Sequence, residues 1–155
     1  SQAANALENG LALEPENPGA HFDLGNAYYK LNRYQEAIEE YETAISFDEL
    51  FWPAIINIGL VLYEMGELEP AIEQWERSLS VSEEEPEPTL AIAVARYAAN
   101  VNRPAAIELA TAALERDSRY ADLEFLAENL WGNHLLSATE AMFGTPGLQE
   151  VLSGL

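Results

Sequence analysis

The sequence repeats itself with a period of 34 residues. The matching pairs are Gly25 and Gly59, Ala37 and Ala71, Ile38 and Ile72, and Tyr41 and Trp75. A fixed period of this length is typical of helical solenoids, in which one unit cannot bury its apolar face alone and neighbouring units stack to complete a core. The sequence therefore predicts an all-α fold of stacked helix pairs.

The spacing of apolar residues predicts two helices in each unit. Residues 34–47 carry apolar side chains at the i, i+1, i+4, i+7, i+8 positions of an amphipathic helix. Pro18 suits a first helical turn, so the preceding helix is expected over 18–31. The second unit copies the pattern over 52–65 and 68–81, with a turn at Gly66.

Small residues are expected to set the distance between paired helices. The predicted facing pairs are Gly25 with Ala37 and Gly59 with Ala71. Tyr41 and Trp75 are expected to fill the space toward the neighbouring helix.

The remaining chain follows the period less closely. Residues 1–17 resemble the second helix of a partial unit, and 18–51, 52–85 and 86–120 are expected to form three units. One residue is inserted in the third, either in the acidic link 83–88, expected to be a solvated loop, or in the turn 100–103. Residues 121–155 are expected to form capping helices or a degenerate repeat, with helices over 121–131, 134–143 and 148–152. The half unit at the start indicates either a piece of a longer protein or an N-terminal cap.

The charge excludes several kinds of partner. The chain has 27 acidic and 7 basic residues and a net charge of −20. Such a charge repels nucleic-acid backbones and anionic lipid headgroups, so no nucleic-acid partner is expected. No membrane span or signal peptide is apparent, and there is no cysteine, so a cytoplasmic location is expected.

No pattern of catalytic or cofactor-binding residues is apparent. The two histidines, His21 and His134, lie in separate units, and no base lies at a spacing that would activate a nucleophile. Metal-ligand spacings and phosphate-binding glycine loops are absent from the sequence. We therefore expect a protein that is not an enzyme, has no cofactor or metal, and uses both histidines structurally.

Two units resemble a known family closely. Residues 24–30 read Leu-Gly-Asn-Ala-Tyr-Tyr-Lys, followed by Tyr-Gln-Glu-Ala-Ile-Glu at 34–39, and the second unit matches through Gly59, Gly66 and Trp75. This pattern resembles the tetratricopeptide repeat, as found in bacterial proteins. The resemblance implies an α-α superhelix of antiparallel helix pairs, in which the first helix of each pair lines a concave groove for a peptide or partner helix.

Transferring the family's groove positions to this sequence gives nine candidate residues. They are Phe22, Asn26, Tyr29, Lys30, Ile56, Leu60, Tyr63, Glu64 and Tyr97, with the third unit's register left open by the insertion. Asn26 and Asn57 match the asparagines with which some members grip a carboxylate tail, but Phe22 stands where that site needs a basic residue, so such a clamp is not expected.

The resemblance and the charge together predict a protein–protein interaction scaffold. Its expected partner is an apolar or amphipathic segment, which can carry basic residues, and a role in complex assembly is one extension. Two alternatives remain open: the adaptor region of a larger enzyme, and a structural module that self-associates through its N-terminal edge.

Overall fold

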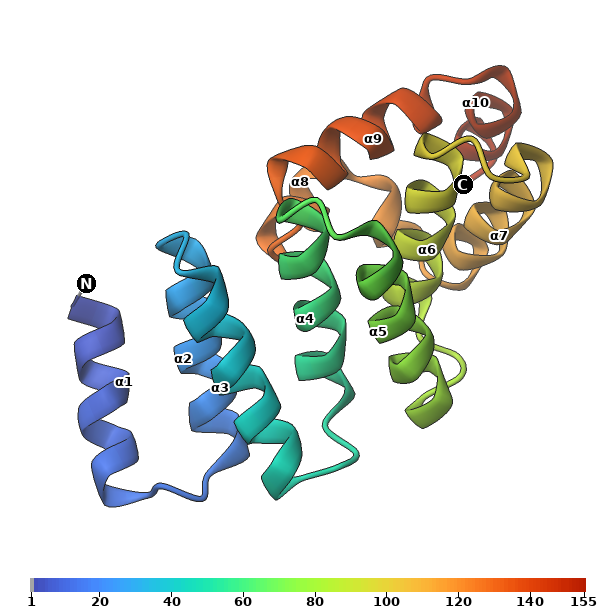
Figure 1. Cartoon of the computed structure of the whole chain (residues 1–155). Helices are drawn as coiled ribbons and strands as arrows, with labels where there is room; N and C mark the ends of the chain where they lie inside the picture. Colours follow the sequence, from blue (N-terminus) through green and yellow to red (C-terminus); the bar gives the residue numbers. More distant parts are fainter. Residues whose placement is uncertain (1) are drawn as a thin grey trace.

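A computed structural model describes residues 2–155, which are folded as helices without any strand (Figure 1). The all-α prediction is therefore confirmed. Within that range the elements are α1 (Gln2–Leu13), α2 (Pro18–Lys30), α3 (Tyr34–Phe47), α4 (Trp52–Glu64), α5 (Leu68–Val81), α6 (Pro86–Ala98), α7 (Arg103–Arg116), the 3₁₀ helix η1 (Ser118–Ala121), α8 (Leu123–Glu128), α9 (Asn133–Phe143) and α10 (Pro146–Ser153).

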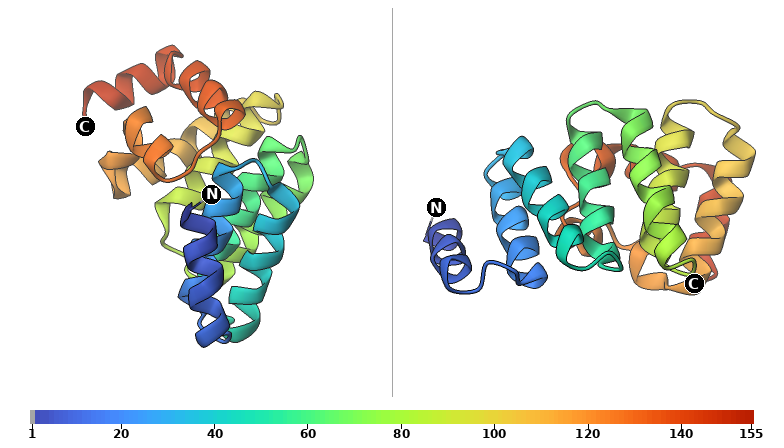
Figure 2. Two further views of the ribbon diagram at one scale, coloured as in Figure 1. Left: turned by 90° about the vertical axis from the view of Figure 1, so that its left-hand side faces the viewer. Right: turned by 60° about the horizontal axis from the view of Figure 1, so that its bottom comes forward.

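The first seven helices stack in sequence order. The closest packed neighbours are α2 with α3, α4 with α5, and α6 with α7, and α1 packs against α2. Figure 2 shows the row of helices running from the N-terminus toward the third pair. This arrangement is the solenoid of helix pairs that the 34-residue period predicts.

The inserted residue lies in the turn between α6 and α7. The first helices begin at Pro18, Trp52 and Pro86, each 34 residues after the last, whereas α7 begins 35 residues after α5. The longer turn holds two residues with positive φ, Asn100 (59°) and Asn102 (43°). Asparagine tolerates this left-handed region better than most residues, so the turn accommodates the extra residue without disturbing either helix.

The acidic link is only partly a solvated loop, which corrects the expectation for 83–88. Glu83 and Glu84 are exposed, but Pro86 already begins α6, and Glu87 and Pro88 are buried. Proline at the first helical position has no N–H to leave unpaired, which favours a helix start at this point.

Two glycines allow aromatic rings to lie directly against the partner helix. A Cβ atom on Gly25 would come within 2.6 Å of Tyr41 Cε1, and one on Gly59 within 2.4 Å of Trp75 Nε1. The rings thus pack inside their own helix pair rather than only toward the next one. Trp75 Nε1 also donates a hydrogen bond to the carbonyl of Ile56 at 3.1 Å.

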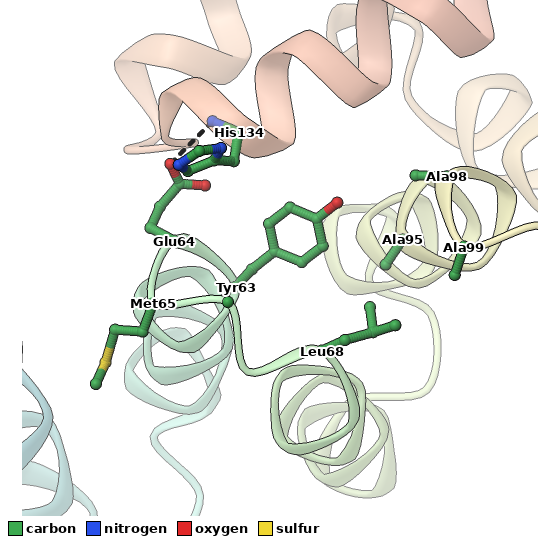
Figure 3. Close-up of a pocket in the computed structure, with 9 residues that line it drawn as sticks. Tyr63, Glu64, Met65, Leu68, Ala95, Ala98, Ala99 and His134 are labelled. Atoms are coloured by element: carbon green, nitrogen blue, oxygen red, sulfur yellow. Dashed lines mark hydrogen bonds between the residues drawn. The ribbon is translucent and has the colours of Figure 1, made fainter.

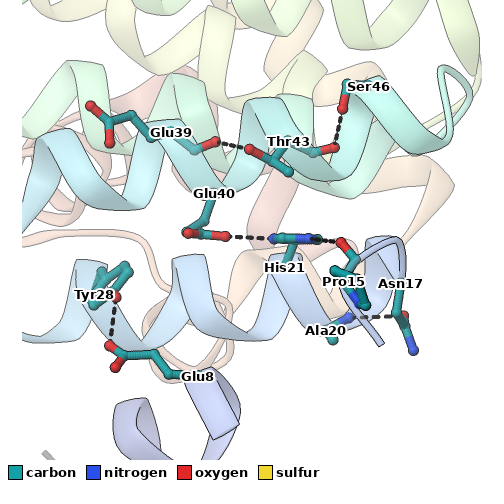
Figure 4. Close-up of polar contacts among 10 residues, drawn as sticks. All are labelled: Glu8, Pro15, Asn17, Ala20, His21, Tyr28, Glu39, Glu40, Thr43 and Ser46. Carbon is teal, nitrogen blue, oxygen red and sulfur yellow. Dashed lines mark hydrogen bonds and ion pairs between the residues drawn. The ribbon is translucent and has the colours of Figure 1, made fainter. Parts of the chain in front are cut away.

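Polar contacts attach α1 and its link to the first pair (Figure 4). Tyr28 Oη donates to Glu8 Oε1 at 2.7 Å, and this contact raises the Tyr28 pKa to about 12. His21 places Nδ1 2.6 Å from Glu40 Oε2 and Nε2 2.7 Å from the Pro15 carbonyl oxygen. His21 therefore has a structural role at the junction of α1, α2 and α3.

The C-terminal helices turn back on the solenoid. Helix α10 contacts α7, so it covers part of the last pair, while α9 contacts α6 and α4 and crosses the row (Figure 1). The helix expected over 121–131 is shorter: α8 ends at Glu128, and Leu130 has a φ of 70°. A positive φ at leucine interrupts the helix and redirects the chain toward α9.

Candidate partner-binding groove

The first helices α2, α4 and α6 form one face of the solenoid, which we call the first-helix face. Helix α9 packs on its α4 and α6 portion. The chain's own C-terminal segment therefore covers the second and third pairs on this side and leaves α2 uncovered by α9.

Glu64, at the end of α4, fixes the beginning of α9. Its Oε1 accepts from the His134 amide at 2.9 Å and its Oε2 from the Leu135 amide at 3.1 Å (Figure 3). The N-cap residue of α9, Gly132, has no side chain to satisfy these amides. A carboxylate is favourable at this place because helix N-termini present unpaired N–H groups and a partial positive charge.

Gly132 permits this contact because it has no side chain. A Cβ atom there would come within 2.2 Å of Glu64 Cδ, closer than any real contact. The glycine that interrupts the C-terminal helices in the sequence thus also allows Glu64 to reach α9.

Trp131 and Glu87 form a second anchor. Trp131 is buried, and its Nε1 donates to Glu87 Oε2 at 3.1 Å. Glu87 is 9% exposed, and its pKa is raised to about 7, chiefly because burial disfavours the charged form. The Trp131 hydrogen bond opposes this rise, and the charge of Glu85 adds to it.

Two neighbouring cavities lie between the first-helix face and the segment 120–133, and we call them together the inner groove. The larger, of about 330 Å³, is lined by Phe22, Asn26, Trp52, Pro53, Asn57, Glu87, Tyr120, Glu128, Asn129 and Leu130. The smaller, of about 220 Å³, is lined by Tyr29, Lys30, Asn32, Tyr34, Glu64, Ala127, Leu130, Trp131, Gly132 and Asn133. Leu130 contributes to both.

A third cavity, of about 480 Å³, lies between α4, α6 and the start of α9. Tyr63 points into the space between α4 and α6, and Glu64 and His134 stand at its edge (Figure 3). Alanine side chains of α6 form the opposite wall.

The two asparagines on the first-helix face are hydrogen-bonded to each other and to Tyr41. Tyr41 Oη donates to Asn26 Oδ1 at 2.5 Å, and Asn57 Nδ2 donates to the same oxygen at 2.9 Å. Burial raises the Tyr41 pKa well above its usual value. This network links the first two pairs across the floor of the larger cavity.

Six of the nine predicted groove residues line one of the three cavities. Phe22 and Asn26 line the larger cavity of the inner groove, Tyr29 and Lys30 the smaller one, and Tyr63 the third, while Glu64 lines both the smaller and the third. Tyr97 lies outside these cavities, under the Arg103 guanidinium at 4.6 Å from the ring centroid.

Ile56 and Leu60 are core residues, which corrects their prediction as groove residues. Each is 1% exposed. Helix α4 contacts α3, α5 and α9, so its apolar positions are covered from several sides. Neither side chain is available to a partner.

Tyr29 is also largely buried, at 7% exposure, although it lines the smaller cavity. Within residues 2–155 its hydroxyl is the buried side-chain polar atom that lacks a hydrogen-bond partner. Burial, and secondarily the Glu64 charge, raise its pKa.

The sequence gave no indication of the groove's second wall. Tyr120, Glu128 and Leu130 belong to the segment where the repeat pattern fades, so no family position could be transferred to them. Trp52 and Glu87 had a usable signal, because both lie in the first turn of a first helix whose start the 34-residue period predicts.

Two further searches of the structure gave no match. Across 2–155, no group of three or more histidine, cysteine or acidic residues is arranged to hold a metal ion. In the same part of the chain, no helix is both long and apolar enough to cross a membrane.

Comparisons with known proteins agree with the fold. A family model described as tetratricopeptide repeat matches residues 1–50. No curated protein matches the sequence. Solved structures of MamA are similar: one is 26% identical with a TM-score of 0.67, over 76% of this chain and 68% of that one. A second is 27% identical with a TM-score of 0.65, over 77% of this chain and 65% of that one.

A third MamA structure, the RS-1 ArsTM double mutant, aligns with 99% of this chain and 85% of its own, at a TM-score of 0.67 and 16% identity. That identity supports the fold alone. The chain spans about two thirds of the length of the first two MamA chains.

Proposed function

Because this chain is a tetratricopeptide repeat protein, we propose that it is a protein–protein interaction scaffold that binds a segment of a partner in the inner groove. The observation that carries the proposal is an open groove on the first-helix face, the face on which the family binds peptides. The covering of α4 and α6 by α9 confines the site to the groove beside α2.

The walls of the groove suit a short segment with apolar side chains. Phe22, Trp52 and Tyr120 supply aromatic surface, and Asn26, Asn57 and Asn129 supply hydrogen-bonding groups. An aromatic lining with a few polar groups is typical of peptide and ligand sites. The net charge of −20 would draw a basic or neutral partner rather than an acidic one.

Glu128→Lys tests this proposal with little effect on folding. Glu128 is exposed and lines the larger cavity, so a lysine there places the opposite charge at the groove. The matched control is Glu124→Lys, which makes the same charge change at an exposed position of the same helix, outside the cavity.

The assay compares proteins captured by immobilised wild type and by the two variants. We expect partners that wild type and Glu124→Lys retain and Glu128→Lys loses. An identical set on all three proteins would contradict binding in the inner groove, and the family's assembly role or an adaptor role in a larger enzyme would need another surface.

Self-association through α1 is a second candidate, supported by one observation. Leu13, at the end of α1, is 86% exposed, and α1 packs against α2 at the end of the row. Sedimentation at several concentrations is the test: a rise in mass that Leu13→Asp abolishes would support it, and a constant monomer mass would reject it.

A further inference from the structure

Glu87 is a buried carboxylate that lacks a basic partner. The five ion pairs formed within residues 2–155 involve other acidic residues. The carboxylate accepts one hydrogen bond, from Trp131 to Oε2, and Oε1 accepts none within this range. A buried anion is costly unless it is paired and hydrogen-bonded, so the site is incomplete as it stands.

The surroundings of Glu87 suit a cation. It lines the larger cavity together with three aromatic residues, and the cavity lining includes Glu128 but neither lysine nor arginine. Aromatic faces attract cations through the ring quadrupole, and more strongly where water is excluded. The groups that face the cavity therefore combine a carboxylate, aromatic surface and amide oxygens, the chemistry that recognises an ammonium or guanidinium group.

We propose that the larger cavity of the inner groove binds a lysine or arginine side chain of the partner segment, whose cationic group pairs with Glu87. The inference rests on the proposed function and adds a specificity residue to it. Aromatic surface contacts the aliphatic stem, Glu87 Oε1 accepts from the cation, and Trp131 keeps the carboxylate in place through Oε2.

The test uses the full chain and three synthetic pentapeptides, with acetylated and amidated ends. Each has a leucine on either side of a central lysine, arginine or glutamine. Binding is followed by ¹H–¹⁵N NMR titration, with the Trp131 indole N–H resonance as the direct reporter because this group donates to Glu87. We expect saturable shifts of this resonance with the lysine and arginine peptides, and binding of the glutamine peptide that is about tenfold weaker.

Glu87→Gln is the matching protein variant, because glutamine keeps an acceptor for Trp131 and removes the charge. It should reduce the lysine-peptide affinity about tenfold, toward that of the glutamine peptide. Glu39→Gln, an equal charge change at an exposed position of α3, should leave the affinity unchanged. The comparison of peptides on wild type decides the question even where Glu87→Gln folds poorly.

The outcomes separate this inference from the proposed function. Equal shifts of groove resonances by the lysine, arginine and glutamine peptides would overturn the cation site and retain the groove. No shift with any peptide would also overturn it, while the capture experiment with Glu128→Lys would still judge the groove as a partner site.

Discussion

Gly59→Ala should destabilise the protein although alanine is the better helix former. The new Cβ would come within 2.4 Å of Trp75 Nε1, 2.7 Å of Cδ1 and 2.8 Å of Cε2. Trp75 is fully buried, so the ring has no free space to enter. Overpacking of this kind costs about 1–3 kcal/mol.

Displacement of the ring also weakens its hydrogen bond to the Ile56 carbonyl, which contributes roughly 1 kcal/mol. Replacing a mid-helix glycine by alanine returns about 1 kcal/mol. The net loss is about 2 kcal/mol, which for a chain of this size lowers Tm by roughly 4–8 °C. Thermal and urea unfolding followed by far-UV circular dichroism would measure it.

Gly10→Ala is the matched control. Gly10 lies inside α1, and no atom would approach an added Cβ within 4 Å, so this change should stabilise the helix by up to about 1 kcal/mol. Stability of Gly59→Ala equal to or above that of wild type would refute the packing argument.

A double-mutant cycle identifies the ring as the cause. In a Trp75→Ala background the added methyl group meets no ring, so Gly59→Ala should be neutral or stabilising there. The third pair already has this combination, with Ala93 and Ala110 at the corresponding positions, both buried. An equal loss in both backgrounds would assign the cost to another contact.

Two further predictions concern the anchors of the C-terminal segment. Burial raises the Glu87 pKa to about 7, above the unfolded value, so the folded state holds its proton more tightly and stability is lost as pH rises from about 4.5 to 7. Glu87→Gln should remove this loss, roughly 3 kcal/mol, and urea unfolding of both proteins at about pH 5 and pH 8 checks it, since parallel curves would contradict it. Glu64→Ala should cost about 1–3 kcal/mol and speed amide exchange at His134 and Leu135, whose N–H groups lose their acceptors. The exposed Glu67→Ala should change neither, and unchanged exchange at both amides of Glu64→Ala would refute the capping role.

Sequence periodicity was sufficient to predict the helix pairs, because the contacts that form them are local. The helices at 34–47 and 68–81 occur at the predicted bounds, and the first helices begin 34 residues apart. A residue in one unit contacts the same residues in its neighbours, so one period predicts the whole row. The position of the inserted residue was not predictable, since both candidate segments could accept it and only the turn geometry distinguishes them.

The candidate groove was predicted only in part. Phe22, Asn26 and Lys30 line the cavities as the family pattern implies, but Ile56 and Leu60 are buried, and half of the groove wall comes from 120–133. A periodic pattern identifies which helix face is apolar. It does not distinguish a face that binds a partner from one that the chain itself covers.

The sequence alone determined the solenoid, its acidity and the side on which binding is expected. The tertiary structure decided that α9 lies across this side, that Glu64 and Glu87 serve as its anchors, and that the open groove is confined to the vicinity of α2. The reason is the range of the contacts: Glu64 and His134 are 70 residues apart and Glu87 and Trp131 44 apart, in a segment without the repeat. Such pairings follow from the packing of the whole chain, which no local pattern records.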